Sequence, residues 1–347
     1  MVNRTNFARI VGVNYYLPKG ELTNADLSEQ FPEWTVEKIA KKTGISSRRI
    51  ADETEFASDL AIASAEALLL SLDMNAQDID FLIVCTQSPD FYMPITAGIV
   101  HDRLGLSTRV GATDINLGCS GFVYGLGLAK GLIESGQAAN ILLITTDTYS
   151  KFLNTEDKSV RTIFGDGAAS TLISGDGDTE SLAGFTYGTD GSGGGYLVVP
   201  NGGLRPGASL NEESSAAARG LKSSGFDLYM NGSEIFNFTL RVVPESVEKI
   251  LDKTDMDLED VDLFIFHQAN RFMLEHLRNK LGIEQSKFFV CMETSGNTVS
   301  STIPIALSEA QKSGVLQDGM KIMLLGFGVG LSWGGLMLTW SSAPLQE

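Results

Sequence analysis

The chain alternates between short, almost wholly apolar runs and longer segments in which apolar residues recur at helical spacing. Four such runs stand out, at residues 81–85, 141–144, 263–267 and 322–325. Their composition predicts strands that helices cover on both faces. The spacing of apolar residues in 57–72 and 238–251 predicts amphipathic helices ahead of two of these strands. The pattern indicates an α/β fold.

The two halves of the chain repeat one pattern. Asp80 and Asp262 are 182 residues apart (262 − 80), and so are Cys85 and His267 (267 − 85). In each half the strand precedes a helix, a second strand and a glycine that opens another helix. The predicted helices are 96–104 and 271–281, and the predicted second strands are 112–116 and 288–292. We therefore predict an internal duplication, with halves 1–180 and 181–347 packed as one unit.

Cys119 lies in Gly118-Cys119-Ser120-Gly121, where a predicted strand passes into a helix over 122–132. The positive end of the helix dipole favours a thiolate and predicts a lowered thiol pKa. The alternative is a small buried core residue, which is the usual fate of a free cysteine. We assign that alternative to Cys85 and Cys291, which fall inside apolar strands. The flanking glycines favour a nucleophilic role for Cys119.

Two polar residues of the second half follow predicted strands. His267 ends the strand 263–267, and ligands of open α/β sheets gather beyond the carboxyl ends of strands. Asn297 takes the place in the second half that Cys119 holds in the first. A buried, hydrogen-bonded histidine and a helix-capping asparagine are the ordinary alternatives. Two halves packed face to face would direct Cys119, His267 and Asn297 into one crevice.

Glycines punctuate three further segments. Residues 326–330 follow the strand 321–325, and a turn there can point backbone N–H groups at an oxyanion, although a tight hairpin explains the glycines equally well. Residues 164–169 predict a close-packed turn. The stretch 188–225 predicts a surface loop over 202–220, and it lacks the lysine of a phosphate-binding loop.

Composition and charge narrow the function. The chain has 26 Lys and Arg against 43 Asp and Glu, a formal charge of −17, which argues against nucleic acid as a partner. No apolar run is long enough to cross a membrane, and Met1–Ile10 lacks the apolar core of a signal peptide, so we expect a cytoplasmic protein. Three cysteines form no disulfide framework, and no Cys or His spacing suggests a metal.

Taken together, these residues resemble the β-ketoacyl-acyl-carrier-protein synthase III family of the thiolase superfamily. The resemblance runs over nearly the whole chain, and its order and spacing are specific. It is carried by Thr43-Gly44-Ile45, Gly118-Cys119-Ser120-Gly121-Phe122, Phe164-Gly165-Asp166-Gly167-Ala168, Asp190-Gly191-Ser192-Gly193, Tyr229-Met230-Asn231-Gly232, His267-Gln268-Ala269-Asn270, Gly296-Asn297-Thr298 and Gly326-Phe327-Gly328-Val329-Gly330.

The resemblance implies a thiolase-like, duplicated five-layer α/β/α/β/α fold and a homodimer. It implies acyl transfer to Cys119, then decarboxylative Claisen condensation with a malonyl-type thioester whose carbonyl His267 and Asn297 bind. The backbone N–H groups of Cys119 and Val329 would hold the oxyanion. Coenzyme A or acyl-carrier-protein thioesters would be substrates, with no other cofactor, in fatty-acid initiation or a dedicated lipid or secondary-metabolite pathway.

The expected substrate-binding positions depart from the family's pattern. Lys42 and Lys158 stand where the family has arginines, so bidentate phosphate contacts and stacking are lost, and Trp34 comes four residues earlier than the family's tryptophan. Met93 replaces a phenylalanine that gates the partner subunit's acyl pocket. Arg271 is shifted by one position in the basic helix expected to receive an acidic carrier protein.

Two other functions remain open from the sequence. Acyl-Cys119 can be transferred to an alcohol or amine, with His267 as general base and less use for Asn297. The other is a non-catalytic role as the partner subunit of a heterodimer. The presence of all three candidate catalytic residues, Cys119, His267 and Asn297, weighs against it.

Overall fold

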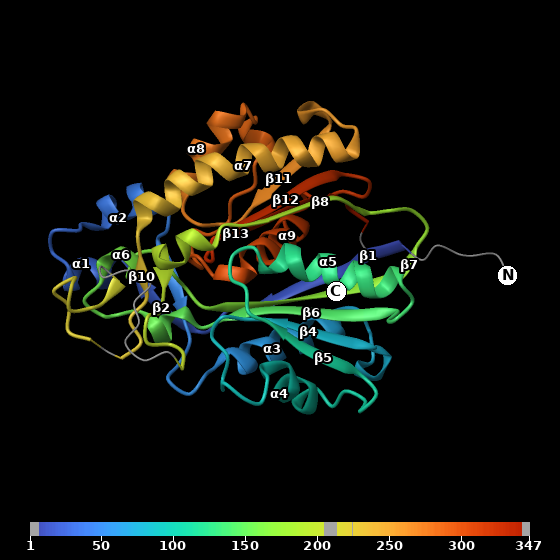
Figure 1. The fold of residues 1–347 in the computed structure, drawn as a ribbon, viewed down its shortest axis with the longest axis horizontal. Coiled ribbons are helices and arrows are strands. Elements are labelled where there is room, and N and C mark those ends of the chain that lie inside the picture. Colours follow the sequence, from blue (N-terminus) through green and yellow to red (C-terminus); the bar gives the residue numbers. More distant parts are fainter. Residues whose placement is uncertain (1–6, 205–213, 224, 342–347) are drawn as a thin grey trace.

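The computed structural model describes residues 7–204, 214–223 and 225–341. Within them the chain forms two main sheets and three layers of helices (Figure 1). The first sheet has the strand order β1-β7-β6-β4-β5. Its strands are β1 (Phe7–Tyr16), β4 (Phe81–Cys85), β5 (Gly111–Ile115), β6 (Asn140–Asp147) and β7 (Gly167–Gly177). Strand β4 runs parallel to both β5 and β6.

The second sheet has the order β11-β12-β13-β8. Its strands are β8 (Leu182–Thr189), β11 (Leu263–Phe266), β12 (Lys321–Gly328) and β13 (Ser332–Thr339). Strands β11 and β12 are parallel, with Leu263 opposite Ile322, whereas β12 and β13 form an antiparallel hairpin. The glycines 326 and 328 therefore lie within a strand, and the predicted turn begins later, at Val329.

Two helices lie between the sheets, α5 (Gly121–Glu134) and α9 (Thr302–Lys312) (Figure 1). Their apolar side chains pack with both sheets in one core, for which Phe122 and Leu126 of α5 and Ile303 of α9 are examples. Helices α3 (Ala57–Ser71) and α4 (Thr96–Arg103) cover the outside of the first sheet. Helices α7 (Gly232–Thr254) and α8 (Arg271–Leu281) cover the second. The predicted five-layer fold is confirmed.

The smaller elements cluster at one end of the molecule (Figure 1). They are β2 (Gly20–Thr23), α1 (Asn24–Gln30), α2 (Val36–Thr43), β3 (Ser47–Ile50), α6 (Lys158–Arg161), β9 (Leu197–Val198) and β10 (Tyr229–Met230). A 3₁₀ turn, Gly191–Tyr196, occupies part of the glycine-rich stretch between the halves. The surface loop predicted for 202–220 lies partly outside the described residues, as does most of Met1–Ile10.

The second strand predicted for the second half, 288–292, is wrong. One isolated bridge joins Phe288 to Phe264, and Cys291 lies outside any strand. The side chain of Gln268 explains the difference, since its oxygen accepts from the N–H of Cys291 at 3.1 Å and its nitrogen donates to the carbonyl of Phe289 at 3.4 Å. The Phe289 carbonyl and the Cys291 N–H therefore bond to a side chain and not to a neighbouring strand.

The strands of the first sheet all precede residue 178 and those of the second all follow residue 181. The division into two structural halves at 180 stays a prediction, although the sheets divide at this place. No helix among the described residues is long and apolar enough to cross a bilayer.

Candidate active site

Cys119 lies in the tight turn between β5 and α5, two residues before the helix begins. The turn is closed by the N–H of Gly121 donating to the carbonyl of Gly118 at 2.7 Å. The Cys119 side chain is 4% exposed. The sequence prediction of a strand-to-helix nucleophile position is therefore matched by the backbone.

Strand β12 crosses directly against Cys119, and its glycines make this possible. A Cβ at Gly328 would lie 2.6 Å from Cys119 Sγ, and one at Gly326 would lie 2.5 Å from the Cys119 carbonyl oxygen. On the other side, a Cβ at Gly118 would meet Gln87 Oε1 at 2.5 Å. Glycine is required at these three positions because any side chain would clash with the packed atoms around the nucleophile, and not because the backbone needs to be flexible there.

The electrostatics of Cys119 differ from the expectation. Burial raises the pKa of its thiol to about 12, against the lowering effect of hydrogen bonds from the backbone N–H groups of Val329 and of Cys119 itself. The resting side chain is therefore a neutral thiol, and the predicted lowering of its pKa is wrong in this environment. Acylation needs a proton acceptor. The same two N–H groups converge at the sulfur.

His267 follows β11, and its backbone N–H continues the sheet by donating to the carbonyl of Leu325 at 2.8 Å. Its Nδ1 lies 2.7 Å from Thr302 Oγ1, at the start of α9. The ring packs edge-on against Phe327, with 5.7 Å between the ring centroids. Burial lowers the pKa of His267 to about 3, so the imidazole is neutral at ordinary pH.

The hydroxyl of Thr302 determines which ring nitrogen of His267 carries the proton. It donates to the carbonyl of Val299 at 3.1 Å, so it has only lone pairs to offer to Nδ1. Nδ1 is therefore the protonated nitrogen, and Nε2 has a free lone pair.

Asn297 is joined to the first half of the chain through its backbone. Its N–H donates to the carbonyl of Ile163 at 2.9 Å, and its carbonyl accepts from Gly165 at 3.0 Å. Gly165 is confined to glycine because a Cβ would lie 2.1 Å from the Ser295 carbonyl oxygen. The close packing predicted for 164–169 is therefore present, but the predicted turn is wrong, because β7 already begins at Gly167. The N–H of Val299 donates to Asn297 Oδ1 at 2.9 Å. This bond occupies the amide oxygen and leaves the NH₂ group available to the cavity that Asn297 lines.

These three side chains line one cavity of about 120 Å³, as predicted for a shared crevice. Its remaining wall is mostly apolar: Phe164 comes from the first half of the chain, and Leu197, Ile235 and Phe327 come from the second. A neutral thiol, a neutral imidazole and a carboxamide thus line the same mostly apolar cavity. Such a site suits acyl chemistry in which charge develops on carbonyl oxygens.

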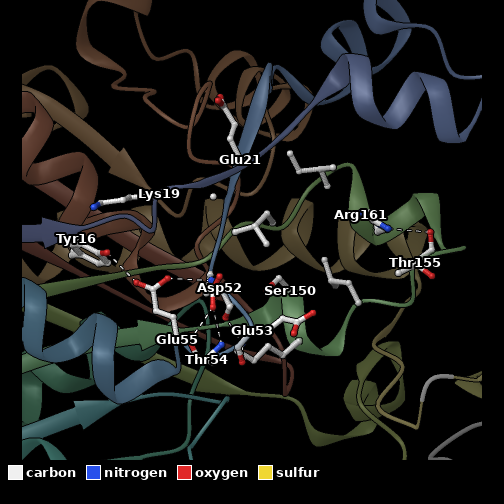
Figure 2. Close-up of a pocket in the computed structure, with 16 residues that line it drawn as sticks. Tyr16, Lys19, Glu21, Asp52, Glu53, Thr54, Glu55, Ser150, Thr155 and Arg161 are labelled. Atoms are coloured by element: carbon white, nitrogen blue, oxygen red, sulfur yellow. Dashed lines mark hydrogen bonds between the residues drawn. The ribbon is translucent and has the colours of Figure 1, made fainter.

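A larger cleft of about 830 Å³ lies elsewhere, beside β2 and the loop after β3 (Figure 2). Several of its polar groups bond to one another: the Tyr16 hydroxyl donates to Glu55 at 3.0 Å, and Lys151 Nζ donates to the Asp52 carbonyl at 2.8 Å. None of Cys119, His267 and Asn297 lines it. Size alone therefore does not identify the active site, and we assign it to the smaller cavity.

The structure gathers two of the predicted substrate-binding residues around one indole ring. Lys42 Nζ lies 4.9 Å and Lys158 Nζ 5.9 Å from the centroid of Trp34, and Lys38 Nζ lies 5.3 Å from it. Trp34 lies just before α2, four residues earlier than the family's tryptophan. Four residues are about one helical turn, so Lys42, near the end of α2, still reaches the ring. Lys158 also forms an ion pair with Glu33.

Arg271 and Met93 lie in different surroundings. Arg271 begins α8 and covers the end of α2, since a Cβ on Gly44 would lie 2.3 Å from Arg271 Cβ; its guanidinium is 3.7 Å from Glu293. Met93 is 85% exposed on the loop between β4 and α4 and does not line the cavity of its own chain.

Sequence reasoning missed two residues next to the site. Thr302 orients His267, and the fully buried Asp147 ends β6 close to the nucleophile turn. The sequence could have indicated Asp147, because it is a charged residue shortly after an apolar run that predicts a buried strand. Thr302 carried none, since a threonine at a helix start is ordinary.

The layered fold and this cavity are those of a condensing enzyme of the thiolase superfamily. Two family models match, 3-oxoacyl-[acyl-carrier-protein] synthase III over residues 113–191 and its C-terminal region over 251–340. The chain is 39% identical over 331 residues to the β-ketoacyl-[acyl-carrier-protein] synthase III of Clostridium perfringens, covering 95% of this chain and 98% of that one. The corresponding protein of Caldanaerobacter subterraneus is 36% identical over 337 residues, covering 96% and 98%.

Solved structures agree. A crystal structure of a 3-oxoacyl-(acyl-carrier-protein) synthase III shares 46% identity and a TM-score of 0.91, covering 96% of this chain and all of that one. A 3-oxoacyl-(acyl-carrier protein) synthase from Burkholderia xenovorans shares 37% identity with a TM-score of 0.90, and the match covers 98% of this chain and 95% of that one. The chain belongs to the β-ketoacyl-[acyl-carrier-protein] synthase III family.

Proposed function

We propose that this condensing enzyme transfers an acyl group from a thioester to Cys119 and joins it to a malonyl-type thioester with loss of CO₂. The observation that carries the proposal is the single cavity in which the thiol, the imidazole and the carboxamide meet. The enzymes it resembles are named for 3-oxoacyl products on an acyl carrier protein.

In the first half-reaction His267 serves as the general base. Its unprotonated Nε2 accepts the proton of the Cys119 thiol as the sulfur attacks the acyl thioester, and the imidazole becomes imidazolium. The backbone N–H groups of Cys119 and Val329, which already meet at the sulfur, hold the oxyanion of the tetrahedral intermediate. The S–C bond to the donor breaks, and the donor thiolate takes its proton from solvent.

In the second half-reaction His267 acts as a donor in its protonated form, which the negative charge of the malonyl carboxylate stabilises once that group enters the buried cavity. Its Nε2–H and the Asn297 NH₂ group bind the carbonyl oxygen of the malonyl thioester and stabilise the enolate that forms as CO₂ leaves. The enolate carbon bonds to the acyl carbonyl, the bond to Cys119 sulfur breaks, and the thiolate recovers its proton from His267. The net reaction consumes one proton, which is the one that the donor thiolate takes up.

The lysines around Trp34 suit the anionic handle of the donor. Lys38, Lys42 and Lys158 place three cations around one aromatic ring, where a phosphate-bearing, ring-containing group such as coenzyme A finds both charge and an aromatic surface. Arg271 lies against the end of the same helix and adds charge toward an acidic carrier protein. We assign these residues to thioester recognition on an otherwise acidic protein.

A homodimer is part of the proposal. Strand β5 lies at the edge of its sheet, and the loop before α4 exposes apolar side chains beside it, including Phe91 at 59% and Tyr92 at 67%. An open edge and an exposed apolar patch are features that an interface covers. Met93 lies in this loop and would reach the partner's acyl pocket. Sedimentation of the wild-type chain as a monomer at micromolar concentration would refute this part.

The test of the catalytic proposal is the mass of the intact protein after incubation with a panel of acyl thioesters. The wild-type chain is expected to gain one acyl group and Cys119→Ala none. Malonyl thioester should then release a β-ketoacyl product. Asn297→Ala should keep the acyl adduct and lose condensation; unchanged turnover in Asn297→Ala would favour ester or amide formation. A wild-type protein that gains no acyl mass would refute the proposal.

A further inference from the structure

Asp147 is a buried carboxylate beside the active site with no cation among its hydrogen-bond partners. It is the last residue of β6 and is fully buried. Its Oδ1 accepts the backbone N–H of Gln87 at 2.8 Å, and its Oδ2 accepts both the N–H of Ser300 at 3.2 Å and the Ser300 hydroxyl. Burial raises the pKa of this carboxyl to about 7. A buried polar group is costly unless hydrogen bonds compensate for it, so this arrangement needs a reason.

One oxygen of Asp147 secures the nucleophile side of the cavity. Gln87, held through its backbone, places its side-chain oxygen against Gly118, where a Cβ would lie 2.5 Å away. The same oxygen accepts the Tyr149 hydroxyl at 2.7 Å. The turn that presents Cys119 therefore packs against Gln87, but it is also closed by its own hydrogen bond, from the Gly121 N–H to the Gly118 carbonyl at 2.7 Å, so it keeps its shape when Asp147 is changed.

The other oxygen secures the carboxamide side. Ser300 follows Val299, which has φ = +55°, a left-handed conformation that a β-branched residue adopts only under constraint. The N–H of this same Val299 orients the amide of Asn297, and its side chain faces Gly118. Releasing Ser300 would let Val299 relax and turn the Asn297 amide away from the cavity.

The geometry points to Asp147 as a positioning residue of the condensation step, which clamps the Asn297 turn of the second half to the Cys119 turn of the first. The inference rests on the proposed function, because Asn297 acts on the malonyl thioester. It concerns alignment: the carboxylate touches neither substrate nor the reacting atoms. Misplacement of a catalytic group by about 1 Å costs on the order of 100-fold in rate.

The experiment separates the two half-reactions in Asp147→Asn. The amide keeps the shape of the carboxylate, but it has one acceptor oxygen, so an NH₂ group must face either Gln87 or Ser300. Condensation of preformed acyl-enzyme with malonyl thioester should fall about 10- to 100-fold. Acyl-Cys119 formation, which does not use Asn297, should change by less than about 3-fold under the same reasoning.

Asp80→Asn is the matched control. Asp80 holds the opposite end of β6, where one oxygen accepts the backbone N–H groups of Ala139 and Asn140, both at 2.9 Å. It should lower stability without changing the ratio of the two rates. Ser300→Ala, which deletes one of the bonds to Asp147, serves if Asp147→Asn does not fold. It should lower condensation selectively, and the double variant should be no worse than Asp147→Asn.

The outcomes are distinct. A wild-type protein that takes up no acyl group defeats the proposed function itself. A wild-type protein that condenses, with variants at Asp147 and Ser300 that slow both half-reactions equally or leave both unchanged, overturns the assignment of Asp147 alone.

Discussion

Gly328→Ala tests whether the approach of β12 to Cys119 determines the reactivity of the nucleophile. The new methyl carbon would lie 2.6 Å from Cys119 Sγ and 2.8 Å from Cys119 Cβ. Non-bonded carbon contacts settle at about 3.5–4.0 Å, so the strand and the nucleophile must separate by about 1 Å. Neither can move freely, because β12 is paired with β13 as far as Gly328 and with β11 as far as Leu325, and Cys119 is held in a closed turn.

Two quantities should change together. Overpacking of this kind lowers the free energy of unfolding by about 1–3 kcal/mol. A displacement of about 1 Å at the nucleophile should slow formation of acyl-Cys119 by about 100-fold. The rate is measured by intact-protein mass after rapid quenching, and the stability by urea unfolding. We expect the loss in rate to persist under conditions in which the variant is fully folded.

Gly131→Ala is the matched control for this substitution. Gly131 lies in the same helix that Cys119 precedes, and a Cβ there would meet nothing within 4 Å. It should raise stability by about 0.5–1 kcal/mol, the usual gain of alanine over glycine inside a helix, and leave acylation unchanged. If Gly328→Ala acylated at the wild-type rate, the close contact of β12 with the sulfur would not control the nucleophile.

Three further predictions concern His267 and the lysine cluster. Thr302→Val removes the acceptor that holds the His267 Nδ1 proton and should slow acyl-Cys119 formation by about 10- to 100-fold with little change in KM; an unchanged rate would contradict the base role of Nε2. Burial lowers the pKa of His267 to about 3, so between pH 6.5 and 3 the unfolded chain binds more protons at this residue and stability is lost as pH falls. Below pH 6.5 wild-type should therefore lose up to about 1.4 kcal/mol per pH unit more than His267→Asn in urea unfolding, and parallel curves would contradict the shift. Trp34→Ala should raise KM for coenzyme A thioesters at least about 5-fold and leave kcat unchanged, since one stacked aromatic contributes about 1 kcal/mol or more; an equal effect with pantetheine thioesters lacking the nucleotide would count against the lysine cluster as its binding site.

Much of the fold followed from the sequence because the strands are buried on both faces. The runs at 81–85 and 263–267 are apolar regardless of their neighbours, so the duplication was visible as a constant offset. The strand at 288–292 was mispredicted because apolar composition does not reveal that the Gln268 side chain takes up the backbone groups of Phe289 and Cys291.

The site was partly predictable for the same kind of reason. Cys119, His267 and Asn297 follow strands, and strand ends of a duplicated fold converge. The pKa of Cys119 was not predictable, because the helix dipole is a local effect while burial depends on Gly326 and Gly328 arriving from the far end of the chain. The role of Thr302 also depends on tertiary contact alone.

The nucleophile turn comes before the middle of the chain, yet its walls are among the last residues to be made. Gly326, Gly328 and Val329 enclose Cys119 from a strand that begins at residue 321, and Asn297 is anchored to residues 163–165. During synthesis on the ribosome, Cys119 therefore emerges long before it can hold a tetrahedral intermediate. We expect a nascent or truncated chain lacking β12 to carry an ordinary, unselective thiol, so that acyl transfer assisted by the oxyanion-binding N–H groups begins only in a finished protein.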